Sequence, residues 1–164
     1  MNKVFVYGTL KRNEPNHHWL TEPNNGVSKF LCVGKTQTQY PLIIATRYNV
    51  PFLLYSPGKG HNVEGEIYEV DDKMLAQLDI LEDHPKFYVR EIKSILTDKN
   101  TKPEIVQCWV YLLKDFKSTV LSMPFIACYS NNGSHGLKYI EKSARDPSYD
   151  HTLEVTGKKC KNTP

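Results

Sequence analysis

The sequence lacks the features that would mark a membrane, secreted or nucleic-acid-binding protein. No apolar run approaches the roughly 20 residues that a membrane-spanning helix needs. The net charge is only +3 with both signs interspersed, which is too weak to indicate a nucleic-acid surface. The first residues enter a strand-like run directly, so we expect no signal peptide and a cytoplasmic location.

Motifs for metal, nucleophile and phosphate chemistry are also missing. The four cysteines are widely spaced and include no Cys-x-x-Cys pair, so we expect free thiols. The histidines show no metal-ligand spacing, and neither a Gly-x-Ser-x-Gly elbow nor a glycine-rich phosphate loop occurs. Cys108 lies in the middle of an apolar run, where a small buried hydrophobe explains it better than a nucleophile. We therefore expect neither a metal nor a cofactor.

The length of 164 residues fits one domain with a sizeable core. The pattern of strands and helices fades after about Tyr139. Residues 1–141 are therefore predicted to form the folded domain. Residues 142–164 are predicted to be a C-terminal tail, which could be flexible.

Short β-branched and aromatic runs, separated by proline, glycine and polar residues, dominate the chain. They predict strands over residues 3–7, 30–37, 42–45, 52–55, 63–70, 87–96 and 105–113. A short helix is predicted over residues 17–20 and one substantial helix after the fifth strand. This order favours the α+β class, with a mixed or antiparallel sheet closed into a small β-barrel and flanking helices.

The substantial helix has clear start and stop signals. Asp71 or Asp72 can cap its N-terminus, because a carboxylate there accepts hydrogen bonds from free amides. Pro85 disfavours helical conformation in the residue before it, so the helix should end near Asp83. Its apolar residues recur at helical spacing: Met74, Leu75, Leu78 and Leu81.

One carboxylate falls on this apolar stripe. Glu82 lies four residues after Leu78 and seven after Leu75, so it should point inward from the last turn. Burial and the negative end of the helix dipole would both raise its pKa. A carboxyl group poised nearer neutrality can accept and return a proton. The alternative is that Glu82 reaches solvent at a frayed helix end, or pairs with Arg90 or Lys86.

A second feature lies at the end of the first predicted strand, where the sequence runs Tyr7-Gly8-Thr9-Leu10. Glycine at that position lets the backbone turn sharply with a positive φ. Unpaired amides in such a turn can converge on an anion or on a polarised carbonyl oxygen. The alternative is a plain connection between a strand and a loop.

Two further acids, Glu64 and Glu66, share one face of a predicted strand. Paired carboxylates can hydrolyse glycosides. Two acids on a solvent-exposed face explain the spacing better, and Gly65 between them indicates close backbone packing.

The ordered series of motifs resembles the γ-glutamylcyclotransferase superfamily, and within it the γ-glutamylamine cyclotransferases. The matching stretches cover roughly residues 3 to 140. They are Val4-Phe5-Val6-Tyr7-Gly8-Thr9-Leu10-Lys11-Arg12 with Pro15-Asn16-His17, Tyr40-Pro41-Leu42-Ile43, Val63-Glu64-Gly65-Glu66-Ile67-Tyr68, Met74-Leu75 with Leu78-Asp79, Gln107-Cys108 with Val110-Tyr111, and His135-Gly136-Leu137-Lys138-Tyr139.

The resemblance implies a small barrel with flanking helices and a catalytic glutamate at Glu82. It also implies that Tyr7, Gly8, Thr9 and Leu10 bind the γ-glutamyl group. The implied reaction needs no cofactor and converts a γ-glutamyl amine, such as ε-(γ-glutamyl)-lysine, into 5-oxoproline and a free amine. Tyr88 follows the helix and could line the same pocket, although ordinary strand packing explains it equally well.

Alternative functions remain open at this stage. One is a cyclotransferase for γ-glutamyl amino acids or glutathione, and another is a non-catalytic binding module with the same pocket. We expect a small-molecule substrate, no nucleic-acid or membrane partner, and a monomer.

Overall fold

A computed structural model describes residues 1–99 and 101–158 of the chain. Five strands form a closed barrel in the order β1-β5-β2-β6-β7, and two further strands form a separate sheet. The barrel is mixed, because β1 runs parallel to β7 and every other pair is antiparallel. The predicted α+β barrel with flanking helices is therefore confirmed.

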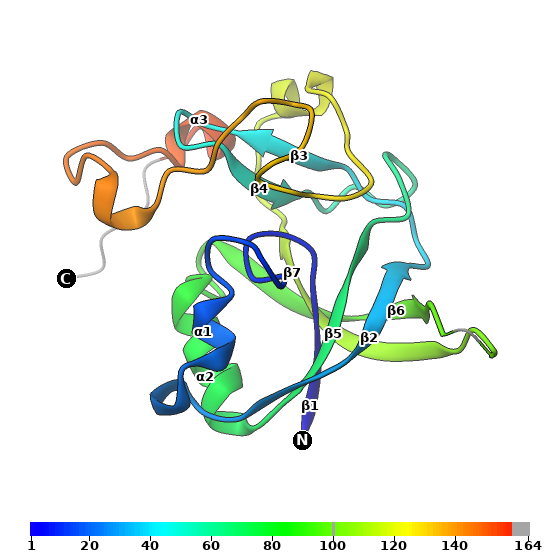
Figure 1. The fold of residues 1–164 in the computed structure, drawn as a ribbon. Coiled ribbons are helices and arrows are strands. Elements are labelled where there is room, and N and C mark those ends of the chain that lie inside the picture. The colour runs from blue at the N-terminus through cyan, green and yellow to red at the C-terminus, as the bar shows by residue number, and fades with distance from the viewer. Residues whose placement is uncertain (100, 159–164) are drawn as a thin grey trace.

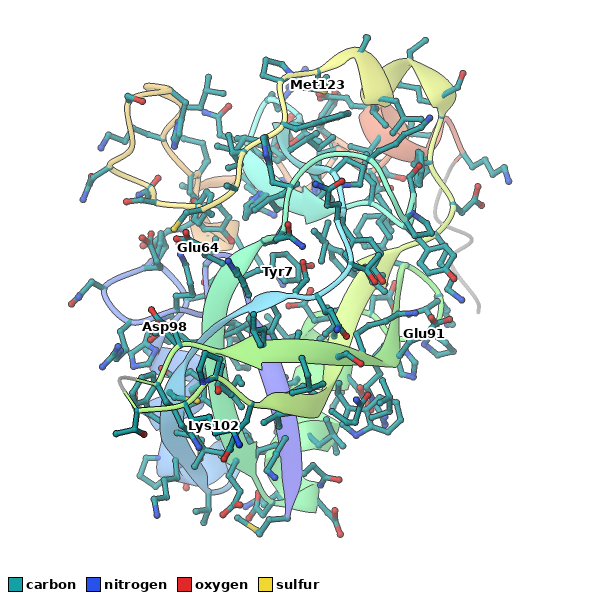
Figure 2. The ribbon with its side chains drawn as sticks, turned by 90° about the vertical axis from the view of Figure 1, so that its right-hand side faces the viewer. Tyr7, Glu64, Glu91, Asp98, Lys102 and Met123 are labelled. Atoms are coloured by element: carbon teal, nitrogen blue, oxygen red, sulfur yellow. The ribbon has the colours of Figure 1, made fainter. Side chains whose placement is uncertain are left out.

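The strands lie close to the predicted segments. The barrel strands are β1 (Asn2–Val6), β2 (Ser28–Thr36), β5 (Glu64–Val70), β6 (Tyr88–Thr97) and β7 (Ile105–Leu113), and the second sheet holds β3 (Leu42–Ala45) and β4 (Val50–Leu53). This second sheet stands over one end of the barrel (Figure 1). Tyr7 lies inside the molecule between these two layers, whereas Asp98 and Lys102 lie at the periphery (Figure 2).

The helices are short. They are α1 (His18–Thr21), α2 (Asp72–Leu81), α3 (Leu153–Thr156) and the 3₁₀ helices η1 (Pro23–Asn25), η2 (Ser118–Ser122) and η3 (Lys142–Ala144). None of the helices in the described residues has the length and hydrophobicity needed to cross a membrane.

Strand β1 is buried on both faces and divides the core in two. Val4 and Val6 join an apolar cluster that also holds Met74 and Leu78 of α2. Phe5 belongs to a second cluster with residues from the other barrel strands. Because the residues of a strand alternate in direction, one strand serves both clusters.

Gly65 on β5 permits close packing against β1. A Cβ atom at this position would lie 2.4 Å from the Val6 carbonyl oxygen and 2.5 Å from the Phe5 ring. Only glycine fits so close to a neighbouring backbone. The close packing expected from the sequence is therefore present.

The C-terminal segment, residues 142–158, carries η3 and α3 and lies beside the β3–β4 sheet (Figure 1). Val155 is fully buried, and its carbonyl accepts a hydrogen bond of 2.8 Å from the Lys117 amide. Just before the segment, the Ile140 amide donates to the Tyr48 carbonyl at 2.9 Å. The division of the chain at residues 141 and 142 stays a prediction, and residues 159–164 lie outside the described ranges.

Candidate active site

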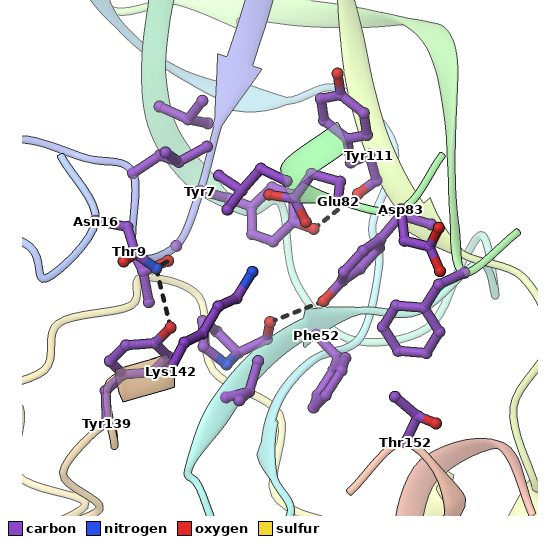
Figure 3. A pocket seen from close by; sticks show the side chains of 18 of the residues that line it. Tyr7, Thr9, Asn16, Phe52, Glu82, Asp83, Tyr111, Tyr139, Lys142 and Thr152 are labelled. Atoms are coloured by element: carbon purple, nitrogen blue, oxygen red, sulfur yellow. Dashed lines mark hydrogen bonds between the residues drawn. The ribbon is translucent and has the colours of Figure 1, made fainter. Parts of the chain in front are cut away.

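A pocket of about 230 Å³ lies between the barrel and the β3–β4 sheet. Its walls come from parts of the chain that are distant in sequence (Figure 3). These include the loop after β1, strand β4, the stretch from the end of α2 to the start of β6, and the C-terminal segment. A pocket of this size suits a small molecule.

Helix α2 places Glu82 in this pocket. Asp71 caps the helix by accepting a hydrogen bond of 2.8 Å from the Met74 amide. Met74 and Leu78 are buried against the barrel. Glu82 is the residue that ends the helix, and its amide donates to the Leu78 carbonyl at 2.9 Å. The apolar stripe therefore fixes the direction of the Glu82 side chain, as its spacing predicts.

The Glu82 carboxyl group is desolvated. Part of its surface is accessible through the pocket, yet protein surrounds the group closely enough to remove most of its hydration. This burial raises the pKa of Glu82 to about 7, while the positive charge of Lys142 opposes the increase. None of the ion pairs in residues 1–99 and 101–158 involves Glu82, because Arg90 pairs with Asp79 at 2.7 Å instead. A carboxyl group in this state can exchange a proton near neutral pH.

The loop from Tyr7 to Leu10 forms the facing wall. Asn16 holds it: its amide donates to the Thr9 carbonyl at 2.8 Å, and its side-chain Nδ2 donates to Thr9 Oγ1 at 3.0 Å. The backbone N–H groups of Gly8, Thr9 and Leu10 have no acceptor among the turn and loop hydrogen bonds of the described residues. The loop therefore presents unpaired donors beside the pocket.

The expected positive φ at Gly8 is wrong, since the glycines with positive φ in the described chain lie elsewhere. Gly8 meets a different constraint. A Cβ atom there would lie 3.0 Å from the Pro51 side chain, at the start of the β3–β4 layer's second strand. Glycine thus permits close approach between the loop and the neighbouring sheet, and this contact could not be read from the local sequence.

Two tyrosines complete the inner wall. The Tyr7 hydroxyl donates to the Tyr111 carbonyl at 2.7 Å, and the Tyr88 hydroxyl donates to the Pro51 carbonyl at 3.3 Å. Burial, together with the nearby negative charge of Glu82, raises the pKa of both phenols well above the usual value. Both therefore remain protonated and serve as neutral donors. Tyr88 packs within strand β6 and also lines the pocket, so it has both of the positions considered for it, strand packing and pocket wall.

Comparison with known proteins identifies the family. The family described as gamma-glutamyl cyclotransferase, AIG2-like, matches residues 4–127. The chain belongs to this family. That range begins within β1 and includes the Tyr7–Leu10 loop, α2 and Glu82, but it ends before the C-terminal segment.

Individual relatives agree with this assignment. The chain is 52% identical over 146 residues to the Drosophila melanogaster protein named "Putative gamma-glutamylcyclotransferase CG2811", covering 89% of this chain and 90% of that protein. It is 42% identical to "Gamma-glutamylaminecyclotransferase" of Mus musculus, and the match covers 88% of this chain and 100% of the mouse protein. The crystal structure of an AIG2-like protein from Mus musculus superposes with a TM-score of 0.84 at 42% identity. The superposition covers 88% of this chain and 99% of the mouse chain.

Beyond the region matched by the family, the C-terminal segment supplies the outer wall of the pocket. Lys142, Arg145, His151 and Thr152 all line it. These residues could not be predicted from the sequence, because the pattern of strands and helices fades after about Tyr139. Lysine, arginine and histidine after the last strand are a weak indication of a binding site, since charged residues are common on solvated surfaces.

The other acids and thiols considered in the sequence lie outside this pocket. The expected solvent-exposed face for both acids is wrong for Glu66, which is buried and pairs with Arg12, whose Nε lies 2.6 Å from the Glu66 carboxylate. Glu64 is exposed, as expected. Burial raises the pKa of the Cys108 thiol to about 12, which keeps it protonated and unreactive. Among the described residues, no group of three or more histidine, cysteine or acidic side chains could hold a metal ion.

Proposed function

We propose that the chain is a γ-glutamylamine cyclotransferase. The reaction converts a γ-glutamyl amine, such as ε-(γ-glutamyl)-lysine, into 5-oxoproline and the free amine. The observation that carries the proposal is the Glu82 carboxyl group, which faces the pocket with a pKa raised by burial to about 7. The name of the mouse relative supports the choice of a γ-glutamyl amine as substrate.

In the proposed mechanism, Glu82 carries protons from one nitrogen atom of the substrate to another. As a carboxylate it removes a proton from the α-ammonium group, and the resulting amine attacks the γ-carbonyl carbon. A C–N bond forms and closes the five-membered ring. The protonated Glu82 then donates to the leaving nitrogen as the original C–N bond breaks, and the regenerated carboxylate accepts the second proton of the ring nitrogen and passes it to the free amine, which leaves as an ammonium ion. The nucleophile is tethered to the electrophile, so little of the entropic barrier remains.

The Gly8, Thr9 and Leu10 amides supply the second element of the mechanism. During attack, the γ-carbonyl oxygen becomes an oxyanion, which fixed hydrogen-bond donors stabilise. The same amides could instead hold the substrate carboxylate. Tyr7 and Tyr88 add neutral hydroxyl groups and apolar ring surface to the wall. We propose that these five residues bind the γ-glutamyl group.

The experiment that tests the proposal is Glu82→Gln, which keeps the shape of the side chain and removes the proton carrier. We expect the release of 5-oxoproline from ε-(γ-glutamyl)-lysine to fall by about 10³-fold or more, while the fold is retained. Glu104→Gln is the matched control, because it makes the same chemical change at an exposed glutamate outside the pocket. Similar rates for wild type and Glu82→Gln would refute the mechanism.

A second candidate is a cyclotransferase for γ-glutamyl amino acids or glutathione. It is favoured by the name of the Drosophila relative, which specifies no amine. Parallel assays with ε-(γ-glutamyl)-lysine, γ-glutamyl-alanine and glutathione distinguish the two. A folded protein that is inert on all three would instead support a non-catalytic binding module.

We further propose that the enzyme acts as a cytoplasmic monomer in the degradation of isopeptides, with the chemistry of a lyase or an intramolecular acyl transfer. The monomer is supported because all groups used by the mechanism come from one chain. The free thiols of Cys32, Cys108 and Cys128 support a reducing compartment.

A further inference from the structure

Two opposite charges face one another across the pocket without forming an ion pair. Lys142 extends from η3 toward Glu82 on the opposite wall (Figure 3). None of the ion pairs within the described ranges joins them. Lys142 is nevertheless the cation whose charge acts on Glu82. The pocket therefore holds a separated anion and cation with space between them.

The Lys142 ammonium group is available to a ligand. Lys142 is exposed as a residue, but its tip reaches into the pocket, where the loss of hydration lowers its pKa. Its side chain makes no hydrogen bond or ion pair with any residue in the described part of the chain. Arg145, the neighbouring cation, is already engaged: its Nε donates to the Ile140 carbonyl at 2.9 Å, and its guanidinium lies 4.9 Å from the centre of the Tyr48 ring.

The charges of a γ-glutamyl group have the complementary arrangement. Its α-ammonium and α-carboxylate groups are attached to the same carbon atom. In the proposed function, the ammonium must approach Glu82 to lose its proton, and this brings the substrate carboxylate close to a second carboxylate. Two like charges in a poorly solvated pocket repel one another unless a cation lies beside them. Lys142 is the cation in position to do this.

Resting on the proposed function, we propose that Lys142 binds the α-carboxylate of the γ-glutamyl group. This assignment leaves the Gly8, Thr9 and Leu10 amides to the oxyanion that forms on the γ-carbonyl oxygen. The C-terminal segment thus supplies a substrate-binding residue to a site whose proposed proton carrier and γ-glutamyl-binding loop come from the region matched by the family. Substrate recognition depends on this segment being docked.

The test uses two substrates that differ only in the α-carboxylate. One is ε-(γ-glutamyl)-lysine, and the other is its decarboxylated analogue, the 4-aminobutanamide of the lysine ε-amine, which cyclises to 2-pyrrolidinone. A charge-assisted hydrogen bond contributes about a 10- to 100-fold difference in binding. We expect Lys142→Met to raise KM for the first substrate by that factor and to leave KM for the analogue within about twofold. Lys142→Arg should restore much of the loss, because it keeps the charge.

Lys138→Met is the matched control for the removal of a positive charge. Lys138 is exposed and donates to Asn132 Oδ1 at 2.5 Å, outside the pocket. The Lys138→Met variant should leave KM unchanged for ε-(γ-glutamyl)-lysine and for its decarboxylated analogue. An equal change in both KM values after Lys142→Met would overturn the assignment, as would no change for either substrate.

A binding measurement separates this inference from the proposed function. Calorimetry measures the binding of 5-oxoproline, which has the carboxylate, and of 2-pyrrolidinone, which lacks it. This compares ligands with and without the carboxylate in the absence of turnover. Lys142→Met should weaken the binding of 5-oxoproline about 10-fold or more and leave 2-pyrrolidinone unaffected. If wild type released no 5-oxoproline, the proposed function would fail, and this comparison would still decide the role of Lys142. Equal loss for both lactams, or equal binding by wild type and variant, would refute it.

Discussion

At the scale of single residues, Glu82 makes the stability of the folded protein depend on pH. Its pKa is about 7 in the folded state, against an ordinary value of 4.5. The folded state therefore holds a proton that the unfolded chain has lost in the interval between these two values. Since protons are bound more tightly by the folded state, the free energy of unfolding should fall as pH rises from about 4.5 to about 7.

Glu82→Gln should remove this dependence. Each unit of pKa shift corresponds to about 1.4 kcal/mol, so the variant should be more stable than wild type at pH 8 by up to about 3 kcal/mol. The difference should vanish near pH 4.5, where both side chains are neutral. Urea unfolding of both proteins at several pH values measures it, with Glu104→Gln as the exposed control. A variant that is less stable than wild type at pH 8 would contradict the burial of the charge.

Glu82 could be predicted because the evidence for it is local. Its distance in sequence from Leu75 and Leu78 fixes its face of the helix, and the cap at Asp71 fixes where that helix begins. Gly8 is the opposite case. Its constraint comes from Pro51, which belongs to another sheet, so the local sequence indicated a turn and gave the wrong reason for the glycine.

At the scale of elements, one cluster of side chains holds the end of α2 against the barrel. Asp79 lies three residues before Glu82 and accepts two hydrogen bonds from Arg90 of β6, at 2.7 and 3.1 Å. It also accepts a hydrogen bond of 2.7 Å from the Tyr111 hydroxyl of β7. Burial alone would raise the pKa of Asp79, but these hydrogen bonds outweigh it and lower the pKa. The cluster positions Glu82, because it anchors the same helical turn.

Asp79→Asn should therefore affect both stability and catalysis. The side chains of Asp79 and Arg90 are 22% and 19% exposed, so losing the charge should cost about 2 kcal/mol, between the values for surface and buried pairs. We expect kcat for 5-oxoproline release to fall with little change in KM, as Glu82 becomes less firmly oriented. Glu104→Gln is the control, since its pair with Lys99 is exposed. Unchanged unfolding and kcat after Asp79→Asn would contradict the role of the cluster.

The strands themselves were predictable, whereas their arrangement was less so. Apolar runs bounded by turns gave the positions of β3 and β7. Which strands pair is decided by partners far apart in the sequence: β1 lies between β5 and β7, and β3 and β4 form a sheet of their own. Such pairing depends on the packing of the whole sheet, which no local pattern contains.

At the scale of the whole molecule, the pocket is complete only when the C-terminal segment is docked. Separate contacts spread along its length hold this segment. Val155 is buried, Glu154 accepts hydrogen bonds from the Arg47 amide, and the Arg145 guanidinium lies over the rings of Tyr48 and Tyr139. Scattered single contacts leave no periodic pattern, so the contribution of this region to the pocket could not be predicted from the sequence.

Val155→Ala should loosen this docking without unfolding the barrel. Removing buried methyl groups from this position should weaken the docked state by about 1–2 kcal/mol, and local opening should become more frequent. We therefore expect faster trypsin cleavage after Lys142 and Arg145, together with a higher KM for ε-(γ-glutamyl)-lysine and a nearly unchanged kcat. The control is Ile105→Ala, at a position that is 46% exposed on β7. It should change neither the rate of trypsin cleavage nor KM. If cleavage accelerated while KM stayed constant, the docked segment would have no part in binding substrate, and the site would consist of the barrel and its loops alone.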